Sequence, residues 1–167
     1  MKCLFLIMLK KSFPPLISTS THTLILGSLP GDKSLAQQEY YAHPQNRFWK
    51  IIKHLCQAPE VTQYTDKVSL LHRNGIGLWD VCAEASRPGS MDLAIKDESP
   101  NRITELLEEY PSITKVIFNG QKAHNLYLKH FMKKKGVRYL CLPSTSPANA
   151  KTNLENLIEQ WRIIISN

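Results

Sequence analysis

The chain has 167 residues, and its 21 Lys and Arg against 14 Asp and Glu give a formal net charge of +7. This length fits one domain, and a 43% hydrophobic share is ordinary for a globular protein, so disordered, collagen-like and fibrous classes are excluded. The positive charge favours a phosphate-rich partner, because Lys and Arg release counterions when they bind phosphates. Ribosomal or membrane-surface contact would also fit this charge.

Residues 1–22 precede the first expected strand. We set them apart as an N-terminal segment whose status is open, and we expect residues 23–167 to form one domain. An apolar run over residues 3–9 lacks the small-residue cleavage site of a secretory signal, and Met8 offers an alternative translation start. The run is also far shorter than the roughly 20 apolar residues of a membrane helix. We therefore expect a cytoplasmic protein without membrane contact.

The cysteines stand singly and far apart, at Cys3, Cys56, Cys82 and Cys141. Zinc and iron–sulfur sites are typically built from Cys-x-x-Cys pairs, and the sequence contains none. Free thiols are the expected state, as is usual in the cytosol. The sequence therefore predicts no metal site.

From Thr23 onward, short apolar runs alternate with amphipathic stretches, a pattern typical of strands joined by helices in an α/β sheet. The expected strands span residues 23–27, 76–81, 115–119 and 138–142. All but the second are near-continuous apolar runs, which suits buried parallel strands. We therefore predict a three-layer α/β/α sandwich around a four-stranded, mainly parallel sheet.

Three helices between and after these strands have recognisable starts or apolar faces. The first is expected over residues 47–55, with its apolar side chains at helical spacing. The second follows Ser99 and Pro100, which fit an N-cap and a first-turn proline. The final helix is expected to begin with the capping box Thr152-x-x-Glu155. The apolar residues of all three are expected to be core.

Ligands of open parallel sheets bind outside the carboxyl ends of the strands, so the loops that follow the expected strands are informative. The first loop, GSLPGDKS at residues 27–34, ends in Lys-Ser as a phosphate-binding loop does. Its spacing fails, because only three residues separate the glycines and Asp32 stands between Gly31 and Lys33. A tight Gly/Pro turn is the expected structure.

The segment YYAHPQNRFW, at residues 40–49, places four aromatic residues, a His, an Asn and an Arg within ten positions. Aromatic faces stack on unstacked bases and carboxamides pair with base edges, so this composition suits a nucleobase pocket. The alternative is that Asn46 caps the following helix while Phe48 and Trp49 pack beneath it. The local pattern favours neither.

The segment LPSTSPAN, at residues 142–149, follows the last expected strand and is rich in hydroxyls and prolines. Hydroxyls and backbone N–H groups bind phosphates, and prolines make such a loop rigid. An ordinary capping loop is the alternative, and composition alone favours it.

The combination of motifs identifies a family. In chain order they are GSLP at residues 27–30, HPQNRFW at 43–49, GLWDV at 77–81, NG at 119–120 and PSTSP at 143–147. From Thr23 to the C-terminal helix they resemble the uracil-DNA glycosylase superfamily. The resemblance is closest to the hypoxanthine-DNA glycosylase (DNA-deoxyinosine glycosylase) branch, with the G:U mismatch-specific branch as the nearest cousin. It implies a uracil-DNA glycosylase-like fold, DNA as the partner, a monomer, and no metal or organic cofactor.

Two positions depart from the superfamily pattern. The mismatch-specific branch carries a water-positioning Asn where Leu29 stands, and leucine cannot position water. The second superfamily motif opens with a catalytic His or Asn, where this chain has Leu142. Two usual catalytic groups are thus absent.

The resemblance also assigns roles to individual residues. Breaking an N-glycosidic bond places negative charge on the departing base, and a fixed amide donor can stabilise that charge. Asn46 is the first candidate, donating to the purine carbonyl or positioning the attacking water, and Asn119 is the second. Tyr41 is expected to stack on the extruded base. The other expected contacts are Ser28, Leu29 and Asp80 to the base, and His43, Ser144, Thr145, Ser146 and Pro147 to DNA.

Some of these residues keep a second interpretation. Asp80 either activates water as a general base or is a structural carboxylate that caps the loop over residues 82–90. His43 contacts phosphate or ring edges, or is a hydrogen-bonded structural residue. The segment after the last strand has no large apolar wedge, so strong insertion into duplex DNA is not predicted and activity on single strands is permitted.

The predicted function is monofunctional excision of deaminated bases from DNA, hypoxanthine first and uracil second, leaving an abasic site. Lyase activity is not expected, because the matched pocket motifs contain no lysine that could form a Schiff base. Two alternatives stay open. One is a G:U mismatch-specific uracil-DNA glycosylase, and the other is a non-catalytic protein that binds damaged DNA.

Overall fold

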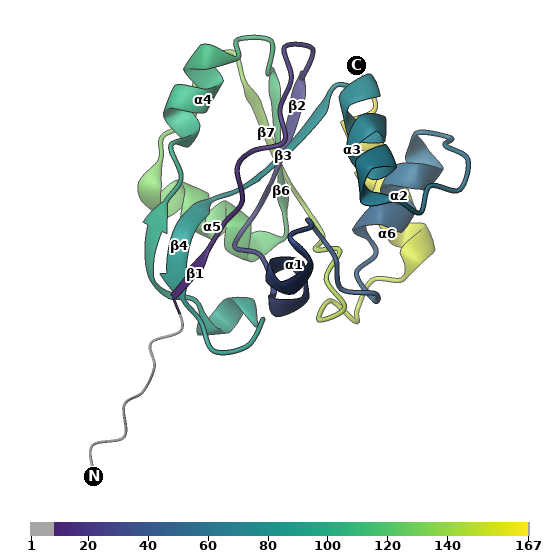
Figure 1. Ribbon diagram of the computed structural model, residues 1–167. Helices are drawn as coiled ribbons and strands as arrows, with labels where there is room; N and C mark the ends of the chain where they lie inside the picture. Colours follow the sequence, from purple (N-terminus) through teal and green to yellow (C-terminus); the bar gives the residue numbers. More distant parts are fainter. Residues whose placement is uncertain (1–8, 167) are drawn as a thin grey trace.

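A computed structural model describes residues 9–166 of the chain (Figure 1). Its central sheet has four strands, all parallel, in the order β3-β2-β6-β7. These strands are β2 (Thr23–Gly27), β3 (Ile76–Asp80), β6 (Lys115–Asn119) and β7 (Arg138–Leu142). All four predicted strands are confirmed, although the second ends one residue earlier than expected and the sheet is wholly parallel.

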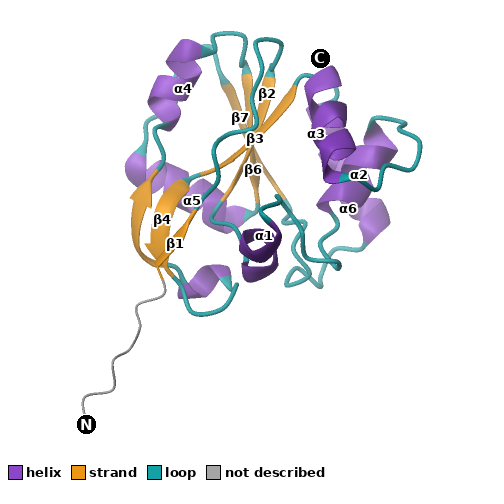
Figure 2. Cartoon of the chain, in the orientation of Figure 1, coloured by secondary structure: helices purple, strands orange, loops and turns teal. Residues whose placement is uncertain are grey.

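Helices cover both faces of this sheet, which confirms the predicted three-layer sandwich (Figure 2). The helices are α1 (Asp32–Gln37), α2 (Phe48–Leu55), α3 (Tyr64–Arg73), α4 (Ile103–Glu109), α5 (Gln121–His130) and α6 (Leu154–Trp161). In β2, Leu24 and Leu26 pack with α4 and α5, whereas Ile25 packs with α2, α3 and α6. This alternation follows from the pleat of a strand, and it explains why a strand buried on both faces is apolar throughout.

The starts of two helices can be compared with their predictions. The helix expected over residues 47–55 is α2, with Arg47 at the cap position. The predicted start of α4 is wrong, because Ser99 and Pro100 belong to a strand in which Ser99 pairs with Glu84. Pairing in a ladder holds Ser99 in extended backbone away from the helix, and α4 begins at Ile103.

The predicted capping box of α6 is also wrong. The cap is Asn153, whose side chain accepts a hydrogen bond from the backbone N–H of Asn156 at 2.8 Å. Thr152 instead gives its carbonyl oxygen to the guanidinium of Arg47. A long-range contact therefore displaces the cap by one residue.

A second sheet, which the sequence pattern did not predict, lies beside the first. It is antiparallel, in the order β1-β4-β5, with strands β1 (Leu9–Lys11), β4 (Cys82–Ser86) and β5 (Lys96–Pro100). Strand β5 reads KDESP and is partly exposed, so it lacks the apolar run by which the parallel strands were recognised. Only Val81 separates β3 from β4, and the chain therefore passes directly from one sheet into the other.

Residues 9–22, which belong to the N-terminal segment set apart above, pack along this fold. Leu9 lies opposite Ser86 in the second sheet. Further on, Leu16 forms a bridge with Leu78, and the indole N–H of Trp79 donates to the carbonyl of Phe13 at 3.0 Å. Most of the apolar run over residues 3–9, including Met8, lies outside the described residues.

Two features of the described chain bear on the class of protein. Cys56, Cys82 and Cys141 carry free thiols, as predicted, whereas Cys3 lies outside residues 9–166. Within residues 9–166, no helix has the length and apolar character that crossing a membrane requires.

Candidate active site

A cavity of about 590 Å³ lies at the carboxyl edge of the parallel sheet. The loops after β2 and β7 line it, together with the last residues of β3 and β6, Asp80 and Asn119, and the hairpin loop (residues 87–95) that joins β4 to β5. All predicted site residues reach this cavity: Ser28, Leu29, Tyr41, His43, Asn46, Asp80, Asn119, Ser144, Thr145, Ser146 and Pro147. The strand ends of an open parallel sheet thus bring together residues that lie far apart in the chain.

Thr145 joins the two predicted catalytic asparagines. Its backbone N–H donates to Oδ1 of Asn119 at 2.9 Å, and Nδ2 of Asn119 donates to the Thr145 hydroxyl at 3.0 Å. That hydroxyl donates in turn to Oδ1 of Asn46 at 2.9 Å. Since a hydroxyl has one proton, donating to Asn46 requires it to accept from Asn119, and the orientation of both amides is thereby determined.

The side chain of Asn46 serves two purposes at once. Its Oδ1 accepts from the Thr145 hydroxyl and from the backbone N–H of Phe48, the first residue of α2, at 2.9 Å. Phe48 and Trp49 are buried beneath it, as the second interpretation predicts, but the N-cap of α2 is Arg47, and Asn46 bonds to the first helical N–H from the residue before the cap. Both acceptor positions of Oδ1 are filled, and Nδ2 has no protein acceptor within residues 9–166. The carboxamide therefore holds the first residue of α2 with its oxygen and leaves its nitrogen as a donor at the cavity.

Both polar atoms of Asn119 are occupied by Thr145. Thr145 has no exposed surface, so a direct contact between its side chain and a DNA phosphate does not fit this arrangement. Thr145 therefore holds Asn46 directly, and Asn119 holds Thr145. Gly120, at φ 96°, allows the close approach, because a Cβ there would lie 3.0 Å from Cβ of Ser144.

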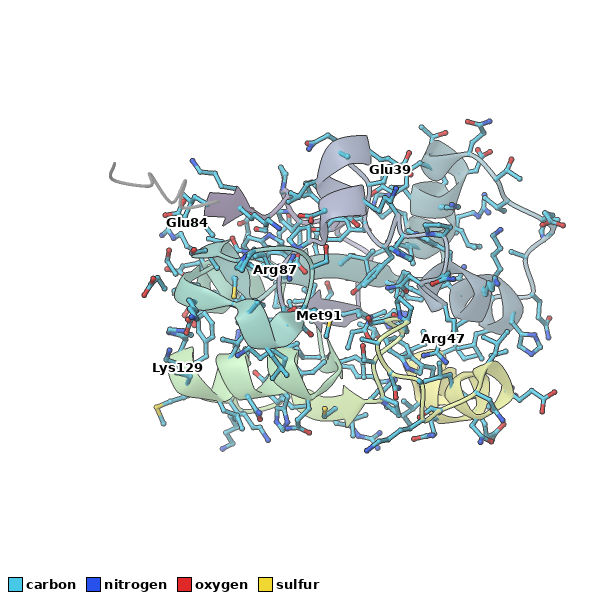
Figure 3. The ribbon with its side chains drawn as sticks, turned by 90° about the horizontal axis from the view of Figure 1, so that it is seen from below. Glu39, Arg47, Glu84, Arg87, Met91 and Lys129 are labelled. Carbon is cyan, nitrogen blue, oxygen red and sulfur yellow. The ribbon has the colours of Figure 1, made fainter. Side chains whose placement is uncertain are left out.

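Arg47 fastens the loop over residues 143–152 to the start of α2. Its backbone N–H donates to the carbonyl of Thr145 at 3.0 Å. Its guanidinium donates to the carbonyls of Ser146 at 3.0 Å, Asn149 at 2.8 Å and Thr152. In Figure 3, Arg47 lies between α2 and this loop. The sequence predicts no role for Arg47 in the site, and the only signal for it is its place in the NRFW motif.

Asp80 ends β3 with its carboxyl group in the wall of the cavity, and it is only 4% exposed. Its Oδ2 is buried without a hydrogen-bond partner. Burial raises the pKa of Asp80 to about 7; the Arg87 cation opposes this shift and the Asp92 carboxylate adds to it. The carboxyl makes no hydrogen bond to residues 82–90, so the predicted loop-capping role is wrong.

The carboxyl of Asp80 and the hydroxyl of Tyr41 both lie close to Gly27. A Cβ at Gly27 would lie 2.6 Å from Oδ1 of Asp80 and 3.3 Å from the hydroxyl of Tyr41, which explains why glycine ends β2. The Tyr41 ring stacks on Phe48 at a centroid distance of 4.1 Å. Burial raises the pKa of Tyr41, so the ring stays neutral at ordinary pH.

The other predicted contacts are held by local hydrogen bonds. Nδ1 of His43 accepts from the backbone N–H of Gln45 at 3.1 Å, which leaves the proton on Nε2. The hydroxyls of Ser144 and Ser146 each accept from a backbone N–H two residues further on. Their protons remain available to an acceptor outside the loop. Pro147 is exposed at the tip of this loop.

Ser28 and Leu29, which follow β2, also line the cavity. Leu29 is buried in the core cluster and gives the cavity an apolar surface that cannot position water. The hydroxyl of Ser28 donates to Oδ1 of Asp92 at 2.6 Å. Asp92 belongs to the hairpin loop, which the sequence analysis did not include in the site. That loop is polar at its start and has no strand or helix pattern that would mark it.

Comparison with known proteins agrees with these features. The family described as Uracil DNA glycosylase superfamily matches residues 14–164. A hypoxanthine DNA glycosylase of Methanosarcina acetivorans is 37% identical, with 94% of this chain and 98% of that protein covered. One from Methanosarcina barkeri is 38% identical, with 87% and 91% covered.

A solved structure has the same fold. It is a solution NMR structure of a Methanosarcina acetivorans protein provisionally assigned as a uracil DNA glycosylase, with a TM-score of 0.80 and 36% sequence identity. It covers 95% of this chain, and 97% of its own chain is matched. The fold, the cavity and these matches define an enzyme of the DNA glycosylase class, whose substrate is DNA. The chain belongs to the uracil DNA glycosylase superfamily.

Proposed function

We propose that this DNA glycosylase excises hypoxanthine from deoxyinosine in DNA, and uracil as a second base, leaving an abasic site. Two relatives named hypoxanthine DNA glycosylase, matched over most of both chains, support this substrate. The observation that carries the proposal is the Asn46 amide, whose oxygen is engaged and whose nitrogen is left as a donor at the cavity. The 6-carbonyl of hypoxanthine is an acceptor that matches such a donor.

The proposed mechanism is hydrolysis of the bond between C1′ and the base. As that bond breaks, its electron pair moves to the base and the sugar gains oxocarbenium character. Nδ2 of Asn46 donates to the base carbonyl, where negative charge develops. Because Thr145 and Phe48 already hold the amide, it needs no reorganisation during the reaction. Water adds to C1′ and loses a proton, and the departing base gains one.

Asp80 can take part in either of two protonation states. As a carboxylate it accepts the proton of the attacking water, and as an acid it donates to the base. A pKa of about 7 makes both forms available near neutral pH. The pH profile of single-turnover excision separates them: the rate rises with pH through about 7 if Asp80 is the base and falls if it is the donor. Asp80→Asn removes this pH dependence in either case.

The other residues are proposed to position these groups and the DNA. Asn119, Thr145 and Arg47 act through Asn46 and its loop, and Tyr41 provides an aromatic surface for the extruded base. The Ser28 and Leu29 walls shape the base pocket. Ser144, Ser146, Pro147 and His43 contact the DNA backbone. We propose further that the enzyme is a monofunctional, single-domain monomer of the cytoplasm that needs no cofactor.

The test is single-turnover cleavage of labelled oligonucleotides that contain deoxyinosine or deoxyuridine, as single strands and in each base pair. Excision of hypoxanthine by the native chain and its loss in Asn46→Asp are the expected results. Much faster cleavage of G:U pairs than of deoxyinosine would identify a G:U mismatch-specific enzyme instead. Selective binding of these DNAs without any abasic product would overturn catalysis and leave a damage-binding protein.

A further inference from the structure

Two apolar side chains project into solvent at the mouth of the cavity. Met91 is 57% exposed and Leu93 is 88% exposed, and both line the cavity from the hairpin loop. Exposed leucine and methionine at a binding site are unfavourable in water and favour an apolar partner. The loop over residues 143–150 also lines the cavity and carries no large apolar side chain.

The hairpin loop holds these two side chains in place. Asp92, which lies between them, accepts from the Ser28 hydroxyl at 2.6 Å and lies 3.8 Å from Nη1 of Arg87. Arg87 is only 1% exposed and donates to the carbonyl of Pro30. Because Asp92 is bound to the body of the protein, its two neighbours are turned outward.

A further contact fixes the start of the loop. Lys10 donates both to the carbonyl of Gly89 and to the carboxylate of Asp32 on α1. In Figure 3, Arg87 and Met91 lie on one side of the view, and Arg47, which marks the loop over residues 143–152, lies on the other. Met91 therefore lies on the side of Arg87 in this view, away from Arg47.

We propose that Leu93, supported by Met91, inserts into the base stack of duplex DNA beside the nucleotide extruded into the cavity. This inference rests on the proposed function. Extruding a base leaves a gap in the stack, and an apolar side chain that fills the gap offsets the loss of stacking. Duplex DNA is the partner that fits, because the neighbouring cavity belongs to a DNA glycosylase and the exposed Lys33 at its edge complements phosphate.

The experiment compares excision from duplex and single-stranded DNA by the native chain, Leu93→Ala and Leu93→Phe. Only a duplex has a stack to open, so the ratio of duplex to single-strand rates should fall about tenfold or more in Leu93→Ala. Leu93→Phe keeps a large apolar side chain and should retain most of the ratio. Leu128→Ala is the matched control, because Leu128 is 51% exposed on α5 and does not line the cavity.

A second measurement does not depend on excision. A 2-aminopurine placed next to deoxyinosine in a duplex becomes fluorescent when it is unstacked. In an Asn46→Asp background, which holds excision back, binding should raise this fluorescence, and adding Leu93→Ala should abolish the rise. If Leu93→Ala changes neither the ratio of duplex to single-strand rates nor the rise in fluorescence, Leu93 does not insert into the base stack, while the proposed function stands. If the native chain excises neither base, the proposed function fails, and the fluorescence alone shows whether Leu93 inserts into the base stack.

Discussion

The two sides of the cavity are held by different forces. On one side, the amide rim (Asn46, Arg47, Asn119 and Thr145) is joined by neutral amide and hydroxyl hydrogen bonds and by a cation bound to carbonyl oxygens. On the other, the charged rim (Lys10, Asp32, Arg87 and Asp92) is joined by ion pairs. Asp80 lies in the wall, and among residues 9–166 its Oδ2 makes no hydrogen bond to either network.

This difference suits different tasks. The hydrogen bonds that orient Asn46 come from a hydroxyl and a backbone N–H, so the orientation of the proposed donor Nδ2 does not change with pH. The charged rim positions the exposed apolar pair on the hairpin loop, and Asp32 is half exposed within it. The strength of its exposed pairs depends on pH and salt. The proposed catalytic donor therefore sits on the amide rim, and the proposed surface contact sits on the charged rim, whose ion pairs respond to solution conditions.

The largest effect is expected from Asn46→Asp, which tests the amide rim directly. Aspartate keeps an oxygen for Phe48 and Thr145 but replaces the donor nitrogen with an acceptor. Single-turnover excision should fall by about 10²–10³, as for other fixed donors to developing charge. The melting temperature should change little.

Asn46→Ala is the comparison, because it also removes the hydrogen bond to the Phe48 N–H at the start of α2 and should cost about 1 kcal/mol of stability. Near-native excision by Asn46→Asp would show that Asn46 does not act as the donor, and its role would then be only the hydrogen bond to Phe48 at the start of α2.

The second effect concerns Asp80 and the stability of the fold. The native carboxyl has a pKa of about 7 against 3.8 for the ordinary group, so the native state holds this proton more tightly than the unfolded state does. The resulting stability is fully present below about pH 4 and is lost as the pH rises to about 7, with a loss on the order of 4 kcal/mol.

Asp80→Asn does not titrate, so its advantage over the native chain should grow across that pH range. Thermal unfolding from pH 4 to pH 8.5 measures it. Parallel stability curves for the two proteins would show that the carboxyl is solvated or paired in solution.

A smaller effect is expected from Thr145→Val, which keeps the shape of the side chain and removes the hydroxyl between the asparagines. The Asn46 amide then loses one of its two anchors, and excision should fall about tenfold. Thr145→Ser restores the hydroxyl and should restore most of the rate. A rate loss in the valine variant that serine fails to rescue would point to packing of the buried methyl group instead.

The smallest effect is expected on the charged rim, from Asp32→Asn. Lys10 holds the pKa of Asp32 below its usual value, so this pair contributes stability above about pH 4 that is lost as the pH falls through the native pKa. Because Asp32 is half exposed, the contribution should be at most about 1 kcal/mol and should shrink with added salt. Urea unfolding at pH 7, at low and high salt, measures it. A larger loss would show that the Lys10 contact also holds the hairpin loop.

The sheet was predictable because its strands are buried on both faces. Every residue of β2, β3 and β6 is buried, and the middle of each strand is apolar, which leaves a clear signal in one sequence. The strands β1 and β5 have no such signal, since their stability comes from pairing with β4. For the same reason Ser99 was assigned to a helix cap, although its backbone belongs to a ladder.

For the site, the sequence by itself determined which chemical groups are present: an asparagine in an aromatic segment, a carboxylate at a strand end, and a hydroxyl-rich loop. It could do so because residue type decides which chemistry a side chain offers. Only the tertiary structure decided how these groups are used. Thr145 is buried and orients Asn46 across 99 positions of the chain, Oδ2 of Asp80 has no hydrogen-bond partner within residues 9–166, and Leu93 projects at the mouth of the cavity. Burial and hydrogen-bond direction depend on neighbours that are distant in sequence, and these neighbours meet only when the sheet forms.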